Sequence, residues 1–222
     1  MMRRNTILST GEIYHVYNKT IGKEFALCSD HHNKHFLSTL QYYRLPQRIK
    51  FSRYRSLPQE IQDDYDRSIN DEKPLVEIYS WALMPNHYHL LLKQNTDEGL
   101  KNFIATIQNS FAKYYNTIEN RTGSLFQHKF KAKHIENNEQ FIHISRYIHL
   151  NPVTSGIITF DQLIDYPWTS FALYNQHNTN NGFVAKDLIL NHFKTSERYI
   201  QFVKNQIEYQ QKLHSIKKLL ID

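Results

Sequence analysis

The sequence predicts an α+β fold in which helices cover an antiparallel sheet. Segments that alternate between apolar and polar residues, as strands do, are interspersed with segments whose apolar residues recur every three or four positions, as in helices. Two strand-like segments, 76–84 and 87–93, are joined only by Pro85-Asn86, and so tight a turn joins antiparallel strands. The 222 residues, 40% of them hydrophobic, suffice for one sizeable domain with its own core.

Four strands are expected in this sheet. EIYHVYNK at 12–19 is the first, because it alternates and is rich in β-branched and aromatic residues. The segments VEIYSWALM at 76–84 and HYHLLLK at 87–93 form the hairpin. A further alternating segment at 125–135 is the fourth strand.

Three helices are expected beside these strands. Residues 31–44 and 97–116 each carry apolar side chains at helical spacing along one face. The third helix starts near Asn138, and Pro152 is expected to end it because proline cannot continue the helical hydrogen bonds.

Two segments lie outside this pattern. Residues 44–74 begin with the basic run RLPQRIKFSRYR and continue with an acidic stretch, which predicts a solvated insertion whose charges compensate one another. Residues 182–213 read as helix with polar faces. We therefore expect one main domain over 1–176, interrupted by a polar insertion at about 44–74, and a helical C-terminal extension over 177–222.

Composition narrows the classes of function. A single cysteine, Cys28, fits a reducing compartment, and the sequence contains neither an apolar run of membrane length nor a recognisable signal peptide. The net charge of +6 favours a polyanionic partner, and an aromatic content of 14% suits single-stranded nucleic acid, whose bases stack on aromatic rings.

A second basic run, RTGSLFQHKFKAKH, contains no acidic residue from Arg121 to His134. With strand periodicity, Lys129, Lys131 and Lys133 share one face. That face is either the solvated side of an ordinary antiparallel strand or a surface that contacts phosphates.

The segment MPNHYHLLL carries two histidines one residue apart. In a strand, His87 and His89 project to the same face, where two imidazoles can share a divalent ion. The 13 histidines of this chain would produce about one such pair by chance, so packing of both rings in the core stays an alternative.

Two segments offer further ligands. The first contains Cys28, His31, His32 and His35, but it has neither a second cysteine nor an intervening glutamate, and we interpret it as the exposed start of a helix. The second is the helix EQFIHISRYIHLN, in which Tyr147 and Asn151 lie one turn apart on the edge of the buried stripe. Asn151 offers an amide oxygen and Tyr147 a phenolic oxygen to a site on the sheet.

The three motifs MPNHYHLLL, GSLFQHKFKAKHI and RYIHLNPVTSG, in this order, resemble those of the single-tyrosine HUH transposases. The similarity is strongest to the REP-associated tyrosine transposases, relatives of the insertion-sequence 200-like enzymes. It begins at about YHVYNK (residues 14–19) and ends at about DYPWTSF (residues 165–171). HUH denotes histidine, a bulky apolar residue, and histidine; Tyr88 in the middle position is a mild departure.

The resemblance implies a ferredoxin-like antiparallel sheet with packed helices and a DNA strand transferase activity. Single-stranded DNA with a hairpin would be cleaved and rejoined through a covalent 5′-phosphotyrosine, with Mg²⁺ or Mn²⁺ as cofactor. His87, His89 and Asn151 would hold the metal, and Tyr147 would be the nucleophile. Basic side chains are candidates for DNA contacts: Lys129, Lys131, Lys133 and Arg146. A cytoplasmic, nucleoid-associated location is a further expectation. Monomer and homodimer both stay open, as does an exchange of the tyrosine helix between subunits, which some relatives show.

Two other functions stay open at this point. A domesticated nucleic-acid-binding protein would keep the fold without cleaving DNA. A hydrolytic zinc enzyme would use a metal-bound water, but no general base is evident near the histidines. The paired tyrosines Tyr114 and Tyr115 are interpreted as packing or base-stacking residues rather than nucleophiles.

Overall fold

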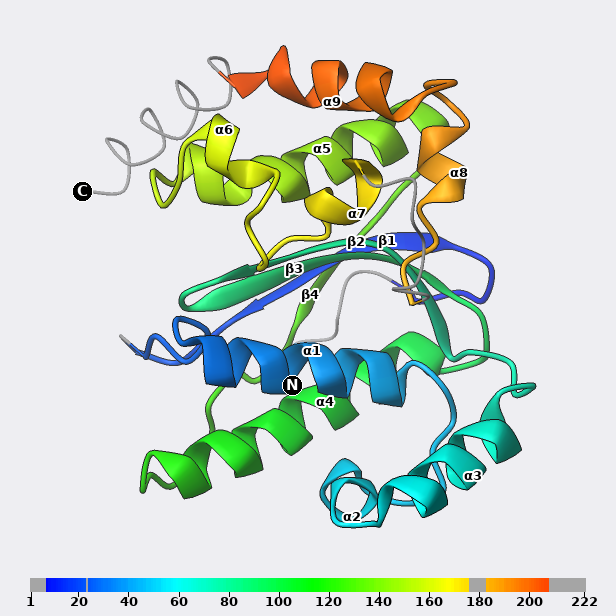
Figure 1. The fold of residues 1–222 in the computed structure, drawn as a ribbon, viewed down its shortest axis with the longest axis vertical. Helices are drawn as coiled ribbons and strands as arrows, with labels where there is room; N and C mark the ends of the chain where they lie inside the picture. The colour runs from blue at the N-terminus through cyan, green and yellow to red at the C-terminus, as the bar shows by residue number, and fades with distance from the viewer. Residues whose placement is uncertain (1–6, 23, 176–182, 208–222) are drawn as a thin grey trace.

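The computed structural model describes residues 7–22, 24–175 and 183–207. It shows one sheet with a layer of helices on each of its two faces (Figure 1). The sheet consists of β1 (Ile13–Lys19), β2 (Val76–Met84), β3 (His87–Gln94) and β4 (Lys131–His134). Its strand order is β2-β3-β1-β4 and all neighbours are antiparallel. With α1 (Asp30–Tyr43) and α4 (Gly99–Ile118), the chain runs β1-α1-β2-β3-α4-β4, the ferredoxin-like order. The predicted fold class is confirmed.

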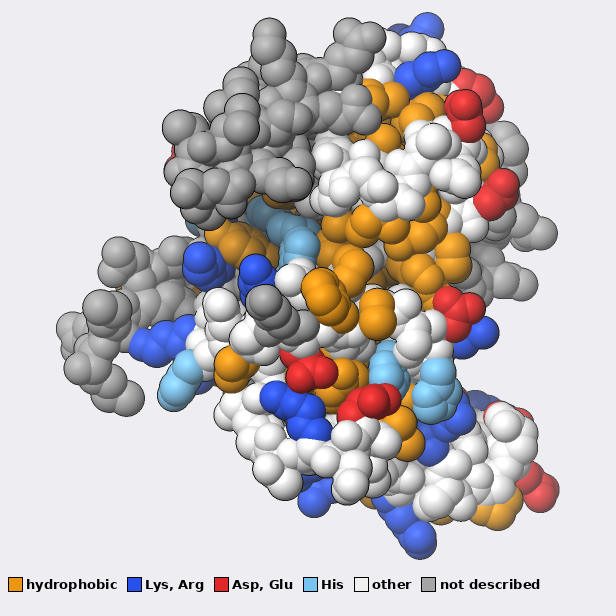
Figure 2. Space-filling model, turned by 90° about the vertical axis from the view of Figure 1, so that its left-hand side faces the viewer, with side chains coloured by type: hydrophobic (Ala, Val, Ile, Leu, Met, Phe, Trp, Pro, Cys, Tyr) orange, Lys and Arg blue, Asp and Glu red, His pale blue; other side chains and the backbone are white. Residues whose placement is uncertain are grey.

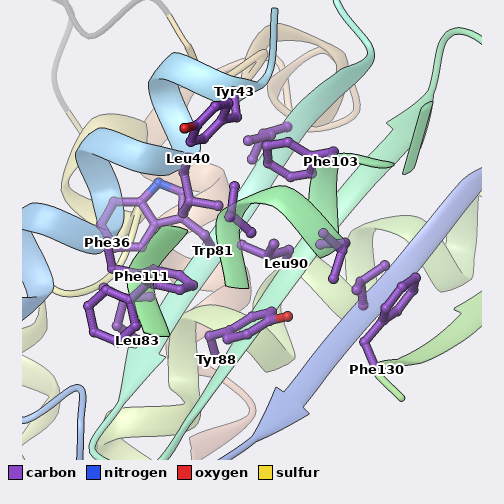
Figure 3. Packing of buried hydrophobic residues seen from close by; sticks show 14 of the residues in the cluster. Phe36, Leu40, Tyr43, Trp81, Leu83, Tyr88, Leu90, Phe103, Phe111 and Phe130 are labelled. Carbon is purple, nitrogen blue, oxygen red and sulfur yellow. The ribbon is translucent and has the colours of Figure 1, made fainter. Parts of the chain in front are cut away.

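The lower layer in Figure 1 contains α1 and α4, which pack on one face of the sheet. Alternate residues of the strands meet the apolar faces of both helices there, as Figure 3 shows for Phe36, Leu83, Tyr88, Leu90 and Phe111. All five side chains are buried. The stripe predicted for residues 97–116 is confirmed, since its four members are fully buried: Leu100, Ile104, Ile107 and Phe111.

The upper layer is built around α5 (Asn138–Thr154), which crosses β2 and β3 on the other face (Figure 1). Four shorter helices surround it: α6 (Phe160–Leu163), α7 (Phe171–Asn175), α8 (Asp187–Leu190) and α9 (Ser196–Lys204). The described part of the C-terminal extension contributes Ile189, Tyr199 and Val203 to the same core as Phe141 and Ile148 of α5. This part therefore packs as a layer of the fold. Residues 176–182 and 208–222, which the predicted extension includes, lie outside the described residues.

A buried polar network attaches α5 to its cover. The His149 ring bonds through Nδ1 to the Tyr199 hydroxyl at 2.8 Å and through Nε2 to the Ser170 hydroxyl at 2.8 Å. The Tyr199 hydroxyl also contacts the Ser145 Oγ at 3.0 Å. Because all four side chains are buried, losing one partner would leave polar groups unpaired, which costs about 1–3 kcal/mol.

The insertion folds as two helices, α2 (Phe51–Arg55) and α3 (Gln59–Ile69). The predicted compensation of charge holds for two pairs, Arg48 with Glu72 and Arg67 with Asp64. The insertion is more than a solvated excursion, however, because Phe51 and Ile69 are buried and Phe51 packs in the core of the lower layer. A short amphipathic segment can bury one aromatic ring without showing a clear period, which is why the sequence pattern missed it.

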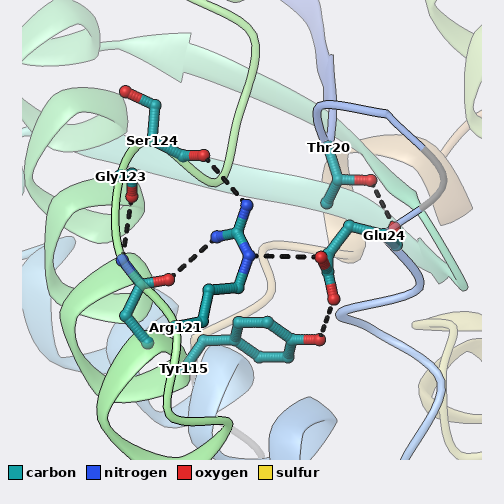
Figure 4. Close-up of polar contacts among 7 residues, drawn as sticks. Thr20, Glu24, Tyr115, Arg121, Gly123 and Ser124 are labelled. Carbon is teal, nitrogen blue, oxygen red and sulfur yellow. Dashed lines mark hydrogen bonds and ion pairs between the residues drawn. The ribbon is translucent and has the colours of Figure 1, made fainter.

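A loop contact fixes the C-terminal end of α4 (Figure 4). The Tyr115 hydroxyl donates to Glu24 Oε1 at 2.5 Å, and the Arg121 guanidinium lies 3.2 Å from Glu24 Oε2. Arg121 also donates to the Ser124 carbonyl oxygen. These contacts tie the loops after β1 and after α4 together, beside the start of the segment that leads to β4.

Three element boundaries differ from the prediction. Strand β4 covers only four residues of the expected 125–135. Before it, Phe126 forms an isolated bridge with Thr20, and the Gln127 N–H donates to the Lys19 carbonyl oxygen at the end of β1. Helix α5 continues past Pro152 to Thr154, although proline has no N–H to donate to the carbonyl oxygen four residues earlier, that of Ile148. In β2 the register to β3 shifts between Ile78 and Ser80, which is a β-bulge at Tyr79.

None of the helices within the described ranges is long and apolar enough to cross a membrane.

We expect acid to destabilise the fold through His149. Burial lowers the pKa of His149 from 6.5 to about 3, so between these values the unfolded chain binds a proton that the folded chain does not. The contribution of neutral His149 to the free energy of unfolding is therefore fully present above pH 6.5. It falls by about 1.4 kcal/mol for each pH unit below that value. Urea unfolding at pH 7 and pH 5, with EDTA present, measures it. His149→Gln should show a shallower pH dependence than wild type, and equal slopes would contradict the assignment.

Candidate active site

The register of the central strands gathers the candidate residues on the α5 face of the sheet. Tyr17 of β1 pairs with His89 of β3, and Lys19 pairs with His87. Because side chains alternate along a strand, His87 and His89 lie on one face while Tyr88 is buried on the other, against α4. The predicted common orientation of the two histidines is confirmed.

Each of these histidines has its Nδ1 atom engaged. The Nδ1 of His87 lies 2.7 Å from the Asn86 Oδ1, an acceptor, so this nitrogen carries the proton and Nε2 keeps a lone pair. The Nδ1 of His89 lies 2.9 Å from the Nε2 of His15. When His89 donates in that bond, its Nε2 also presents a lone pair. The Nε2 atoms are therefore the ones left for a ligand.

Burial keeps all three imidazoles neutral. It lowers the pKa of His87 to about 4, with a smaller contribution from Lys19, and the pKa of His15 to about 4, with a contribution from Lys133. The pKa of His89 is held well below 6.5 by burial and by the other two rings. Neutral imidazole is the form that binds a metal.

Tyr147 and Asn151 of α5 face the same place. The Tyr147 ring lies edge-on to His15 and to His89, with centroid distances of 5.8 and 5.7 Å. Asn151 is buried and donates its Nδ2 to the Tyr147 carbonyl oxygen at 2.9 Å, which fixes the amide. One cavity of about 400 Å³ is lined by His87, His89, Tyr147 and Asn151 together. Because Tyr147 approaches His89 of its own chain, one chain assembles all four residues.

The phenol of Tyr147 is not acidic by itself. Burial, followed by the nearby Tyr17, raises the pKa of Tyr147, and the Asn151 side chain opposes the shift only in part. A phenolate therefore needs a positive charge in the cavity. Lys19 and Lys131 line the cavity, so some positive charge is built into it.

The predicted basic residues divide into two groups. Lys131 and Lys133 are exposed on the α5 face, opposite Tyr17 and His15 of β1. Lys129 is exposed but precedes β4. Arg146 lies elsewhere, because its buried guanidinium stacks 4.0 Å from the Phe202 ring centroid and donates to the Phe202 carbonyl oxygen. The predicted DNA contact of Arg146 does not fit this placement, and the cover formed by α9 is the reason.

The competing clusters lie on the far side of the sheet. Tyr114 lines a cavity between the lower helices, and Tyr115 is buried there against Glu24. His32 pairs with Glu119 at 3.3 Å rather than with His31 or His35. Within the residues that the structure describes, no three histidine, cysteine or acidic side chains converge as a metal site, so a third protein ligand to His87 and His89 would be of another type, such as the amide of Asn151.

Comparisons with known proteins place the chain in a class of DNA-processing proteins. The family model described as "Transposase IS200 like" matches residues 42–151. The chain carries an IS200-like transposase domain, and the resemblance drawn from the motifs is confirmed.

Two solved structures are similar to the chain. A REP-associated tyrosine transposase bound to a REP hairpin is 17% identical, with a TM-score of 0.55 over 78% of this chain and 84% of that one, which shows a shared fold. A transposase-like protein from Deinococcus radiodurans is 13% identical, with a TM-score of 0.36 over 66% of this chain and 95% of that one. No curated protein matches the chain.

Two site residues, His15 and Tyr17, escaped the sequence analysis. They lie in β1, outside the residues that match the family model, and they reach the site only through pairing with β3 and β4. The alternation of EIYHVYNK already put both on one face of a strand, and that was the available signal. It did not show which strand would lie beside them.

We expect His87 to be neutral at pH 7 with its proton on Nδ1. The reason is the acceptor Asn86 Oδ1 at 2.7 Å together with a pKa of about 4. Ring ¹⁵N shifts from long-range ¹H–¹⁵N spectra of the metal-free protein report the tautomer. Asn86→Ala should shift the population towards the other tautomer, while a wild-type ring protonated on Nε2 would contradict this geometry.

Proposed function

We propose that this protein cleaves and rejoins single-stranded DNA beside a hairpin, with Tyr147 as nucleophile and a divalent metal ion held by His87, His89 and Asn151. One observation carries the proposal: a single cavity brings the Tyr147 ring next to His89, with His87 and Asn151 in the same lining. The IS200-like family match supports the choice of DNA as substrate.

The donor atoms suit a metal ion that also binds phosphate. Two neutral imidazole nitrogens and an amide oxygen leave the charge of the ion uncompensated by the protein, so an anionic ligand completes the set. When bound, Mg²⁺ or Mn²⁺ would polarise the scissile phosphate and stabilise the negative charge that develops on it.

The chain's own residues would then carry the group transfer. Tyr147 gives up its phenolic proton to solvent and its oxygen attacks phosphorus. The bond from phosphorus to the 3′ oxygen breaks, and that oxygen takes up a proton from solvent. The products are a 5′-phosphotyrosine and a free 3′-hydroxyl, and attack by a 3′-hydroxyl reverses the reaction without a nucleotide cofactor. Lys131, which lines the cavity 5.8 Å from the Tyr17 ring centroid, favours the phenolate by its charge.

The surface beside the cavity suits the DNA strand that enters it. Lys131 and Lys133 continue the positive charge along β4, and we propose that they contact the backbone together with Lys129. A solved relative of similar fold is bound to a REP hairpin, which supports a hairpin as partner. Such an enzyme would act at the nucleoid in the cytoplasm. Whether the protein is a monomer or a homodimer stays open, and the four site residues line one cavity of a single chain.

Tyr147→Phe should abolish formation of a covalent protein–DNA adduct. Wild-type protein, incubated with hairpin-flanked single-stranded DNA and Mn²⁺ or Mg²⁺, should yield an adduct that survives denaturing electrophoresis, because the phosphotyrosine bond is covalent. Tyr115→Phe is the matched control and should retain the adduct, since Tyr115 lies on the other face of the sheet. An adduct that persists in Tyr147→Phe would overturn the assignment. A wild type that binds hairpins but forms no adduct would favour a binding-only protein.

His15→Ala should weaken Mn²⁺ binding about 10- to 100-fold, the usual effect of removing the group that orients a metal-ligating histidine. The reason is the 2.9 Å bond that keeps the His89 ring in place and engages its Nδ1. Titration calorimetry or electron paramagnetic resonance measures Mn²⁺ binding without DNA. His15→Gln, whose amide oxygen can accept from His89, should recover part of the affinity. Unchanged affinity in His15→Ala would exclude this role.

A further inference from the structure

A second large cavity lies on the face of the sheet opposite Tyr147. It has a volume of about 640 Å³ and is lined by residues from α1, from α4 and from α2 of the insertion. Figure 2 shows histidine side chains over the lower helical layer with Lys or Arg side chains nearby. The motif RLPQRIKFSRYR, which has no part in the proposed reaction, supplies one wall of this cavity.

Three cations line the cavity: Lys50 and Arg55 from the insertion, and Lys113 from α4. All three are exposed, and no acidic side chain lines the cavity. Two acidic residues of the insertion pair with other cations, Glu72 with Arg48 and Asp64 with Arg67. Among the described residues, none of the three cations forms an ion pair, so the charges of the insertion do not compensate at this cavity.

Helix α4 adds a row of neutral hydrogen-bond donors to the cavity. Thr106, Asn109 and Ser110 precede Lys113 along the helix. Thr117 follows Lys113 by one turn, and its hydroxyl donates to the Lys113 carbonyl oxygen. Residues three or four apart share a helix face, so these side chains form one stripe. Hydroxyl and amide groups next to Lys and Arg are the set that contacts phosphate oxygens in protein–DNA complexes.

The floor of the cavity is built from packed rings. His35 stacks on Tyr114 with a centroid distance of 3.5 Å and an interplanar angle of 6°, and the Tyr114 hydroxyl bonds to His31 Nδ1 at 2.7 Å. Burial, followed by the charge on Arg55, lowers the pKa of His35 to about 4. The His35 ring is therefore neutral at pH 7, while the positive charge lies on the walls of the cavity.

We propose that this cavity is a second DNA site, in which Lys50, Arg55 and Lys113 bind the phosphate backbone of the hairpin substrate. The inference rests on the proposed function for its ligand. Its location carries a consequence: the substrate is held on one face of the sheet and cleaved on the other. The insertion thus adds affinity for DNA to the affinity supplied by the lysines of β4.

The test compares two triple variants that remove equal charge from the lower layer. The cavity variant removes the positive charge from the cavity walls by three substitutions: Lys50→Gln, Arg55→Gln and Lys113→Gln. The control variant removes three exposed cations that do not line the cavity: Lys34→Gln, Arg53→Gln and Lys73→Gln. Binding of a labelled DNA hairpin by fluorescence anisotropy is measured from low to moderate salt, in both variants and in wild type. Circular dichroism melting confirms that each variant folds.

We expect the cavity variant to bind the hairpin roughly tenfold to a hundredfold more weakly, and its salt dependence to lose about 2 to 3 units of slope in log K against log salt, near 0.9 per phosphate contact. The control variant should stay close to wild type. At saturating DNA the cavity variant should still form the Tyr147 adduct, because the cleavage site is untouched.

Equal affinity and slope in both triple variants would overturn the proposal. The cavity variant is also tested with an RNA hairpin of the same sequence. If this variant loses affinity for the RNA hairpin but keeps its affinity for the DNA hairpin, the assignment of DNA as ligand is overturned. A wild type that binds no hairpin, or that binds it and forms no adduct, would count against the proposed function instead, so the two failures are distinguishable.

Discussion

The register of β1 against β3 is the constraint on which the site depends. With Tyr17 opposite His89, the odd-numbered residues of both strands face α5 and the even-numbered ones face α1 and α4. A slip of one residue in either strand would reverse this division, since side chains alternate with a period of two. The slip would drive imidazoles into the apolar core of the lower layer. Burial of Val16 and Leu90 on that side therefore holds the histidines on the other.

The position of α5 is the second requirement, because it carries both the phenol and the amide. The helix is held from beneath by the sheet and from above by the C-terminal helices. The bonds of His149 to Tyr199 and Ser170 join these parts in a buried polar network whose members have fixed partners. Such networks favour one arrangement over others, since a shifted helix would leave several polar groups unpaired. The C-terminal segment thereby takes part in placing Tyr147.

The sequence allowed much of this to be predicted. Local periodicity located most elements within a few residues, and the spacing of His87 with His89 and of Tyr147 with Asn151 described side chains that do converge. What it missed depends on packing between distant segments. His15 reaches His89 only because β1 and β3 are neighbours, and Arg146 is buried only because α9 covers it. Neither fact is written in the local pattern of the residues concerned.

The bulge in β2 shows how one residue can decide what a site contains. Before Tyr79 the strand runs in one phase, with Ile78 opposite Leu92; after it, Ala82 lies opposite His89 and Trp81 points into the lower core. A continuous ladder would pair Trp81 with His89 instead and turn its indole towards α5. The largest side chain of the strand would then occupy the space where helix, imidazoles and phenol meet. A single inserted position thus acts as a spacer, and the room available for a DNA strand next to Tyr147 depends on it.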